Sequence, residues 1–329
     1  KNMSTYTEIT SCISEDIARY QEEFERILRT KIPLADNIIR YFLDKKGKQL
    51  RPIMAILAAR IAKGKASDAT IKGAVALELL HNASLMHDDV VDNSELRRGV
   101  ETINKVWDNH IAVLMGDFFL AKCLESSNST RSFAISDILV EMVIRLTEGE
   151  LEQQANAKSH MMNEESYFSV ISGKTASLFS GCLKIGAISV DASDEDVKKL
   201  GEVGELMGLV FQIRDDIFDY FPSTSEVGKP TGHDILEGKI TLPLIYALNH
   251  TSNEENLKMR NLIMDNNEYS QEHVMQLVEY AKSVGGIDYA QAKMKNIAFK
   301  AKNILLSFED TECRKSMMSL IDYFVERQK

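Results

Sequence analysis

Two short acidic stretches decide the fold and function predicted for this chain: Asp88-Asp89-Val90-Val91-Asp92 and Asp215-Asp216-Ile217-Phe218-Asp219. Each has the form Asp-Asp-x-x-Asp and interrupts apolar sequence of helical period. Residues four positions apart lie on the same face of a helix, so the first and last aspartates of each stretch are neighbours. Like charges at this spacing destabilise a helix by roughly 0.2–0.5 kcal/mol, so folding alone gives no reason for them. These two stretches, called here the first and second aspartate motifs, therefore indicate a functional site.

Carboxylate oxygens are the ligands that Mg²⁺ prefers, and bound Mg²⁺ keeps positions for water and for substrate phosphates. An acidic, solvated helix face is the alternative explanation for a single motif. Two copies embedded in apolar sequence favour a magnesium site instead. The predicted ligands and supporting carboxylates are Asp88, Asp89, Asp92, Asp215, Asp216 and Asp219.

The rest of the 329-residue chain predicts helices. Its 44% hydrophobic content allows a sizeable core, and only 5 prolines and 17 glycines are present to break helices. No sustained strand-like alternation, flexible linker or fixed-period repeat occurs. We expect one all-α domain over residues 1–329, with Pro33 ending the first helix and one long loop at 221–238. Helical periodicity is found at residues 6–30, 38–43, 53–91, 110–125, 133–158, 165–191, 195–220 and 240–329.

Composition also excludes several partners. A net charge of −10 argues against nucleic acid, whose phosphates would be repelled. The sequence contains no run of 18 apolar residues, so no transmembrane segment is predicted. The first residues lack the apolar core of a signal peptide. The four cysteines are scattered without metal-ligand spacing, so we expect reduced thiols and a cytoplasmic protein.

Basic residues, although in deficit, lie close in sequence to the acidic motifs. Arg and Lys bind phosphate oxygens, and this placement favours a phosphate role over a solvated surface. No Walker-type loop or dinucleotide fingerprint occurs, so the phosphates are not expected to be those of ATP or NAD. The candidate phosphate-binding residues are Lys48, Arg51, Arg97, Arg98, Lys174, Lys229 and Lys239, with His81 about two helical turns before the first motif.

Several segments, in order along nearly the whole chain, resemble the trans-isoprenyl diphosphate synthases. They are Gly47-Lys48-Gln49-Leu50-Arg51-Pro52, residues 81–98, 149–153, Lys174-Thr175, 211–216 and 228–243. Residue 46 is Lys and residue 49 is Gln where many members have a second Gly and Arg. Binding is expected to survive both differences, because Lys48 and Arg51 remain.

The resemblance implies a bundle of long helices around a central cavity, assembled as a homodimer. It implies that Asp88, Asp92 and Asp215 ligate Mg²⁺ and that the other three motif aspartates support them. Residues expected on the side of the allylic diphosphate are Arg97, Lys174, Gln212, Lys229 and Lys239. Those expected to hold isopentenyl diphosphate are Lys48, Arg51, His81 and Arg98. Thr175 and Gln212 are expected to orient dipoles toward the allylic carbocation.

Product length is expected to depend on the helix that carries the first motif. In this family the growing tail runs beside that helix, so the lining residues lie one to three turns before Asp88. Short-chain members commonly have an aromatic residue at the position of Ala83 or Ser84, and here both residues are small. Ala76 further along is also small, and Leu80 is the one bulky side chain among these lining residues. The small residues predict a long-chain product, although they could instead serve tight helix packing.

Other classes fit less well. Class I terpene cyclases share the first motif, but the sequence from Asp215 onward does not match their second site. A non-catalytic partner subunit usually loses an aspartate motif, and both are intact here. Farnesyl or geranylgeranyl diphosphate remains the alternative product. The exact chain length, the preferred primer and the downstream pathway are not readable from the sequence.

Overall fold

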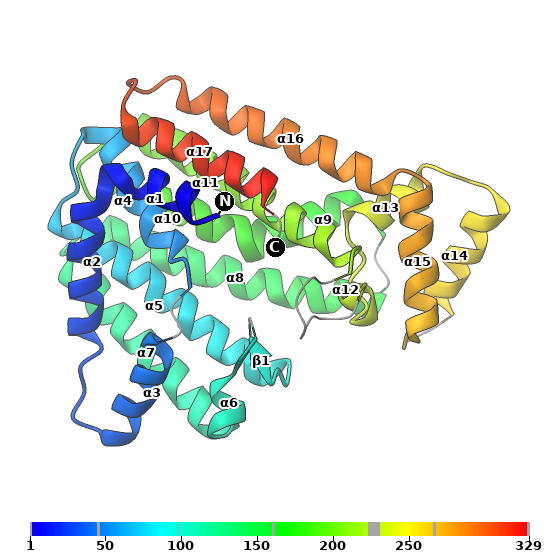
Figure 1. The fold of residues 1–329 in the computed structure, drawn as a ribbon, viewed down its shortest axis with the longest axis horizontal. Helices are drawn as coiled ribbons and strands as arrows, with labels where there is room; N and C mark the ends of the chain where they lie inside the picture. The colour runs from blue at the N-terminus through cyan, green and yellow to red at the C-terminus, as the bar shows by residue number, and fades with distance from the viewer. Residues whose placement is uncertain are drawn as a thin grey trace. The chain divides into compact units, whose positions relative to one another are not determined.

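The computed structural model describes residues 2–44, 47–97, 99–159, 162–222, 231–265 and 268–327 (Figure 1). In these ranges helices dominate, and the strands are limited to the short pair β1 (Leu96–Arg97) and β2 (Val100–Glu101). The all-α prediction is therefore confirmed. Backbone contacts divide the chain into two compact units, and each is described by itself. The prediction of a single domain over residues 1–329 stays a prediction.

The first unit comprises Lys1–Val140, Gly181–Gly201 and Phe308–Met317, and the second comprises Glu141–Ser180, Glu202–Ser307 and Met318–Lys329. Elements wholly within the first unit are α1 (Asn2–Thr10), the 3₁₀ turn η1 (Ser11–Ile13), α2 (Ser14–Ile27), α3 (Pro33–Leu43), α4 (Leu50–Lys63), α5 (Asp68–Val91), α6 (Ile103–Val106) and α7 (Asn109–Ser129). Elements wholly within the second are α9 (Glu164–Ile171), the π turn η2 (Ser172–Ala176), α12 (His233–Leu236), α13 (Leu242–Asn249), α14 (Glu254–Met264), α15 (Gln271–Ser283) and α16 (Gly286–Leu305). Four helices contribute to both: α8 (Phe133–Ser159), α10 (Ser177–Ile188), α11 (Asp194–Asp219) and α17 (Glu312–Glu326).

Helix α5 forms the centre of the first unit and packs on α2, α4 and α7, with α7 running beside it (Figure 1). It begins with a capping box, in which the Ser67 and Thr70 side chains satisfy each other's backbone N–H groups. Most of its side chains are buried on several faces, which explains its nearly continuous apolar sequence. The first aspartate motif lies at its C-terminal end, so the position of the motif depends on this buried helix.

In the second unit α13 packs against α9, α14, α15 and α16 (Figure 1). Its side chains Leu242, Leu244 and Leu248 are fully buried. The second aspartate motif closes α11, and the chain returns through α12 to α13. The elements around α13 therefore support the segment that follows the motif.

Three local predictions differ from the structure. Pro33 does not end a helix but is the first residue of α3, where its missing N–H costs nothing. The helix expected over residues 6–30 contains the 3₁₀ turn η1, and the one over 165–191 contains the π turn η2. Of the loop predicted at 221–238, residues 223–230 lie outside the described part. Among the described residues, no helix is long and apolar enough to cross a membrane.

Candidate active site

The first aspartate motif holds its middle aspartate inside the protein. Asp89 is 7% exposed, and its Oδ1 accepts hydrogen bonds from Arg97 Nε at 2.9 Å and Nη2 at 2.8 Å. Asp88 is half-buried, and Asp92 is exposed at the end of α5. A buried carboxylate needs a paired donor, and here a guanidinium supplies it. Asp89 therefore anchors the motif, whereas Asp88 and Asp92 are more exposed.

The hairpin of β1 and β2 is fastened to the same helix end. The Ser94 amide donates to the Asp89 carbonyl at 2.9 Å, and Thr102 Oγ donates to the Ser94 carbonyl at 2.8 Å. Asn104 Nδ2 donates to the Ser94 carbonyl at 3.0 Å. These bonds fix Arg97 beside Asp89. Arg98, predicted to bind isopentenyl diphosphate, lies outside the described residues.

A cavity of about 500 Å³ opens in the first unit between α3, α5 and this hairpin. It is lined by Asn82 and Asp89 of α5, by Arg97, and by Gly47 and Gln49 of the segment that precedes α4 and contains Lys48. Gln49 has a positive φ of 49°, an uncommon conformation for a residue with a Cβ. The loop that contains Lys48 is thus held next to the first motif. Arg51 and His81 are half-buried in the same unit.

The predicted chain-length residues occupy another face of α5. Ala76, Leu80 and Ala83 are at most 4% exposed and do not line this cavity, whereas Ser84 is half-buried. A neighbouring position shows how tight the packing is: a Cβ on Gly73 would lie 2.7 Å from Ile185 Cγ2. Small side chains on this face therefore allow close helix packing in the structure as it stands.

The second motif buries its middle aspartate without a cation. Asp216 is 4% exposed and accepts hydrogen bonds from Tyr167 Oη at 2.5 Å and from Gln212 Nε2 at 2.8 Å. Burial, followed by the neighbouring Asp234 carboxylate, raises the pKa of Asp216 to about 8, although both hydrogen bonds act in the opposite direction. Burial and Asp234 therefore disfavour a negative charge on Asp216 when no cation is bound.

Asp219 organises the backbone that follows the motif. Its two carboxylate oxygens accept from the His233 and Asp234 amides at 3.0 Å each, and its carbonyl accepts from the Gly232 amide at 2.7 Å. Gly232 has a φ of +74°, a conformation that glycine adopts without strain. Asp219 thereby places Asp234 near Asp216. The supporting function expected for Asp219 toward a metal stays a prediction.

Asp215 is paired with a residue from the far end of the chain. Arg327 Nη2 lies 2.5 Å from Asp215 Oδ1 and donates to the Phe211 carbonyl at 2.9 Å. The guanidinium also stacks on the Phe211 ring at 3.9 Å from its centroid. Arg214 donates to the Arg327 carbonyl through Nε at 3.0 Å and Nη2 at 2.8 Å. A predicted metal ligand thus already has a basic partner.

Lys174 and Thr175 lie in the π turn η2, which interrupts the helix formed by α9 and α10. Such π turns are rare in proteins, and many of those that occur lie at functional sites. Gly149 of α8 lets the turn approach closely, since a Cβ there would lie 2.7 Å from the Lys174 nitrogen. Lys174 Nζ donates to Gln153 Oε1 at 3.1 Å and forms an ion pair with Glu150. The acidic and amide side chains of α8 therefore orient Lys174.

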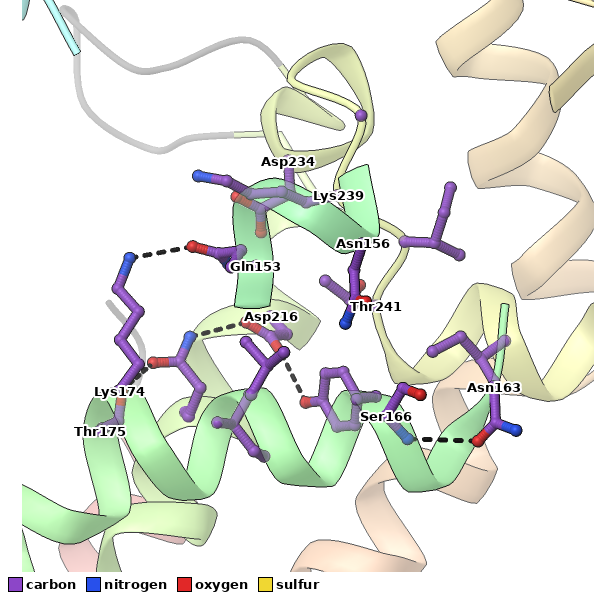
Figure 2. Close-up of a pocket in the computed structure, with 17 residues that line it drawn as sticks. Gln153, Asn156, Asn163, Ser166, Lys174, Thr175, Asp216, Asp234, Lys239 and Thr241 are labelled. Carbon is purple, nitrogen blue, oxygen red and sulfur yellow. Dashed lines mark hydrogen bonds between the residues drawn. The ribbon is translucent and has the colours of Figure 1, made fainter. Parts of the chain in front are cut away.

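These side chains converge on a cavity of about 180 Å³ within the second unit (Figure 2). Thr175 Oγ donates to Gln212 Oε1 at 2.8 Å, which continues the hydrogen-bond chain to Asp216. Lys239 enters from the segment after α12, with its Nζ 2.7 Å from Glu237 Oε2. The cavity thus brings together five predicted residues: Lys174, Thr175, Gln212, Asp216 and Lys239. Lys229 lies outside the described residues.

The donor chemistry of the second motif suits a hard divalent cation. Carboxylate oxygens from Asp215, Asp216 and Asp234 are the available ligand types, and the pKa of Asp216 is raised first by burial and then by the Asp234 carboxylate. Within the described ranges, however, no three Asp, Glu, His or Cys side chains already converge at metal-binding distance. The residue types fit a metal ion. A metal ion bound by Asp215 would have to displace the Arg327 side chain from it.

Sequence reasoning missed four residues of these sites. Tyr167 binds Asp216, Asp234 raises its pKa, Arg327 pairs with Asp215, and Asn104 fastens the hairpin. Asp234 was detectable, because it lies in a segment quoted for the family resemblance. The other three depend on long-range folding and have no local motif.

Comparisons with known proteins agree with this geometry. The family profile described as Polyprenyl synthetase matches residues 32–281. An octaprenyl diphosphate synthase of Escherichia coli (strain K12) is 32% identical over 329 residues, covering 100% of both chains. A crystal structure of polyprenyl synthase from Caulobacter crescentus CB15, complexed with calcium and isoprenyl diphosphate, is 31% identical. Its TM-score is 0.89, with 98% of each chain covered.

A geranylgeranyl pyrophosphate synthase structure from Bacteroides thetaiotaomicron is 35% identical, with a TM-score of 0.84 and coverage of 98% of this chain and 100% of that one. These similarities span nearly the whole chain, include both aspartate motifs and share the all-α architecture. The chain therefore belongs to the polyprenyl synthetase family, has the isoprenoid synthase fold and is a prenyltransferase.

Proposed function

We propose that this enzyme condenses isopentenyl diphosphate with an allylic diphosphate, in a Mg²⁺-dependent reaction, to make a long-chain all-trans polyprenyl diphosphate. The observation that carries the proposal is the cavity of the second unit. There two lysines, a threonine–glutamine dipole pair and a buried aspartate with a raised pKa line one small space. This combination suits an anionic leaving group held by cations.

The expected ligands for Mg²⁺ are Asp88 and Asp92 from the first motif and Asp215 from the second. When bound, Mg²⁺ supplies positive charge that neutralises the departing diphosphate. Asp89, Asp216 and Asp219 hold these carboxylates in place through the hydrogen bonds to Arg97, Tyr167 and the backbone of α12.

The side chains of the second cavity then have separable roles. Lys174 and Lys239 act as point charges on diphosphate oxygens. Thr175 and Gln212 present fixed dipoles that stabilise an allylic cation while water is excluded. Arg97 and Lys229 are assigned to the allylic diphosphate as well. Lys48, Arg51, His81 and Arg98 are assigned to isopentenyl diphosphate.

A long-chain product is supported by the small residues on α5. Ala83 and Ser84 add no aromatic barrier in the first turn before Asp88, and Ala76 is small two turns further on. One helical turn is about 5.4 Å, so each turn of small residues admits roughly one more isoprene unit. The 35% identical geranylgeranyl pyrophosphate synthase keeps the shorter product as the second candidate.

Chromatography of products made from labelled isopentenyl diphosphate tests both the function and the length. Wild type should incorporate label into an extractable long-chain lipid only when an allylic primer and Mg²⁺ are present. Ala83→Phe should stop several units earlier with the rate of the first condensation intact. Leu257→Phe is the matched control, because it adds the same ring to the exposed surface of α14, away from both cavities. An unchanged product distribution in Ala83→Phe would place the tunnel elsewhere.

We also propose a homodimer. In the first unit, helices α7 and α8 expose large apolar side chains, including Leu114, Leu124, Phe133 and Val140, with Phe133 90% exposed. Several large exposed apolar side chains on two consecutive helices support a protein interface there. Light scattering of the purified protein should give twice the chain mass of 37.0 kDa. Leu124→Glu with Phe133→Glu should shift it to the monomer mass.

A cytoplasmic location is the last part of the proposal. All four cysteines are free thiols, as is usual where thiols are kept reduced. Cell fractionation with an antibody to the chain tests this location directly.

A further inference from the structure

Two cysteines from opposite ends of the chain touch in the first unit. Cys12 lies in the 3₁₀ turn η1, and Cys313 is the second residue of α17. Their sulfur atoms are 2.7 Å apart, with the Cys313 thiol donating toward Cys12. Ser316, one turn further along α17, approaches the Cys12 sulfur at 3.5 Å. The two thiols are therefore already side by side in the folded protein.

The surroundings make Cys12 the more reactive thiol. The hydrogen bond from Cys313 lowers the pKa of Cys12 to about 6, and Ser316 and the Arg60 guanidinium act in the same direction. Arg60 is itself held by the buried Asp16 carboxylate at 2.7 Å. The hydrogen bond to Cys12, together with burial, raises the pKa of Cys313. Cys12 is thus the thiol that forms a nucleophilic thiolate more readily, and it is half-buried rather than enclosed, whereas Cys313 holds its proton more tightly.

The other two cysteines are unlike this pair. Cys123 and Cys182 are 3% and 0% exposed. Burial raises the pKa of each thiol to about 12. They are structural thiols in apolar surroundings and provide internal controls for chemistry at Cys12.

We propose that Cys12 and Cys313 form a reversible redox-active dithiol, which a peroxide converts into a disulfide between the N-terminal turn and α17. The Cys12 thiolate attacks one peroxide oxygen, the O–O bond breaks, and hydroxide leaves to give a sulfenic acid on Cys12. The Cys313 sulfur then attacks the sulfenic sulfur, and the S–S bond forms as water departs. Both thiols are oxidised, and the peroxide oxygens are reduced to water. Transient disulfides of this kind are the type found in reducing compartments.

The test uses the full-length reduced protein treated with hydrogen peroxide, quenched with iodoacetamide, digested without reduction and analysed by mass spectrometry. A linked peptide containing Cys12 and Cys313 should form in the folded protein and disappear with dithiothreitol. Cys123 and Cys182 should be alkylated only after unfolding. Absence of the linked peptide, or equal cross-linking through Cys123 or Cys182, would overturn the proposal.

Variants separate the two roles. Cys313→Ser should leave a sulfenic acid on Cys12 that dimedone traps, whereas Cys12→Ser should give neither link nor sulfenic acid. Cys123→Ser should behave like wild type. In the unmodified protein, iodoacetamide at neutral pH should label Cys12 before the other three cysteines, a readout that needs no variant.

Stability gives an independent measurement. The disulfide closes a loop of nearly the whole chain, so oxidation should raise the melting temperature by several degrees, reversibly with dithiothreitol. Peroxide should not raise the melting temperature of Cys12→Ser. A cross-linked protein with an unchanged melting temperature would contradict the fastening of the N-terminal turn to α17.

Discussion

The two aspartate motifs have the same five-residue pattern but bury their middle aspartate in opposite ways. In the first unit Asp89 is held by the guanidinium of Arg97, so its charge is balanced within the protein. In the second unit Asp216 is held by the neutral donors Tyr167 and Gln212, and the nearby Asp234 adds another negative charge. The charge of the first anchor is therefore balanced by a guanidinium, whereas the second anchor has only neutral hydrogen-bond donors.

The third aspartates differ as well. Asp92 directly follows α5 and is exposed, whereas the Asp219 carboxylate accepts hydrogen bonds from the amides of His233 and Asp234. The same residue type at the same motif position is thus exposed to solvent in one unit, whereas in the other it binds the backbone of α12. A sequence pattern alone does not distinguish these two roles.

The largest expected effect comes from removing the predicted ligands that each motif presents. Asp88→Ala and Asp215→Ala should each lower turnover by at least about a hundredfold, because each removes a proposed ligand of Mg²⁺. Circular dichroism should stay unchanged, since losing like-charge repulsion does not harm a helix. Near-normal turnover of either variant at limiting Mg²⁺ would falsify the metal assignment.

The basic pair after the first motif should divide the two substrates. Arg97→Ala should chiefly raise the KM for the allylic diphosphate, and Arg98→Ala that for isopentenyl diphosphate. Loss of a phosphate-binding fork should cost on the order of 1.5–3 kcal/mol in each case. Arg97→Ala also leaves Asp89 without its guanidinium partner, so its thermal stability should be measured alongside. Equal effects of both variants on both substrates would contradict the division.

The two anchors should respond differently to neutralisation. Asp89→Asn should destabilise the protein by about 1–2 kcal/mol at neutral pH, because the charged bond to Arg97 is lost. Asp216→Asn should be neutral or stabilising in metal-free protein at pH about 8, because it removes a buried charge that lacks a cation. Urea unfolding of both variants in EDTA measures the difference.

The pH dependence gives the same contrast with a defined sign. The folded state raises the pKa of Asp216 from 3.8 to about 8. Its contribution to stability is therefore fully present below about pH 4 and is lost as the pH rises toward about 8. Metal-free wild type should lose stability over that window, and Asp216→Asn should lose less. Identical pH profiles for wild type and Asp216→Asn would show that Asp216 is already compensated.

The smallest expected effect concerns Arg327. Arg327→Gln removes the basic partner of Asp215, so Mg²⁺ no longer has to displace it, and Mg²⁺ affinity should rise a few-fold. Titration calorimetry with Mg²⁺ measures this in the absence of turnover. Lys315→Gln, an exposed change on α17 that does not touch Asp215, is the matched control. Weaker Mg²⁺ binding by Arg327→Gln would mean that the arginine positions Asp215 for the metal instead of competing with it.

Much of the fold was predictable because long helices follow from apolar periodicity, as in α5, α7, α8 and α11. The interruptions were not: η1 and η2 involve single-turn changes of hydrogen-bond register that leave the apolar spacing nearly intact. A proline can stop the helix before it and can also begin the helix after it. The sequence alone therefore does not show whether Pro33 ends one helix or starts the next.

The site was predictable where residues act through local motifs. Lys174, Thr175, Gln212, Asp216 and Lys239 were named from the sequence, and the structure gathers them around one cavity. Tyr167 and Arg327 were not predictable as site residues, because their partners lie 49 and 112 positions away in the sequence. Pairings at such separations depend on the packing of whole helices, which periodicity does not specify.

The most direct test of the account is diphosphate release by the purified protein in matched reactions. Release should require an allylic diphosphate, isopentenyl diphosphate and Mg²⁺ together, should stop with EDTA and should resume when Mg²⁺ is restored. Each release should be matched by one isopentenyl unit added to the product. Undiminished release in EDTA, or release from the allylic substrate alone with a cyclised product, would contradict the assignment as a metal-dependent prenyltransferase.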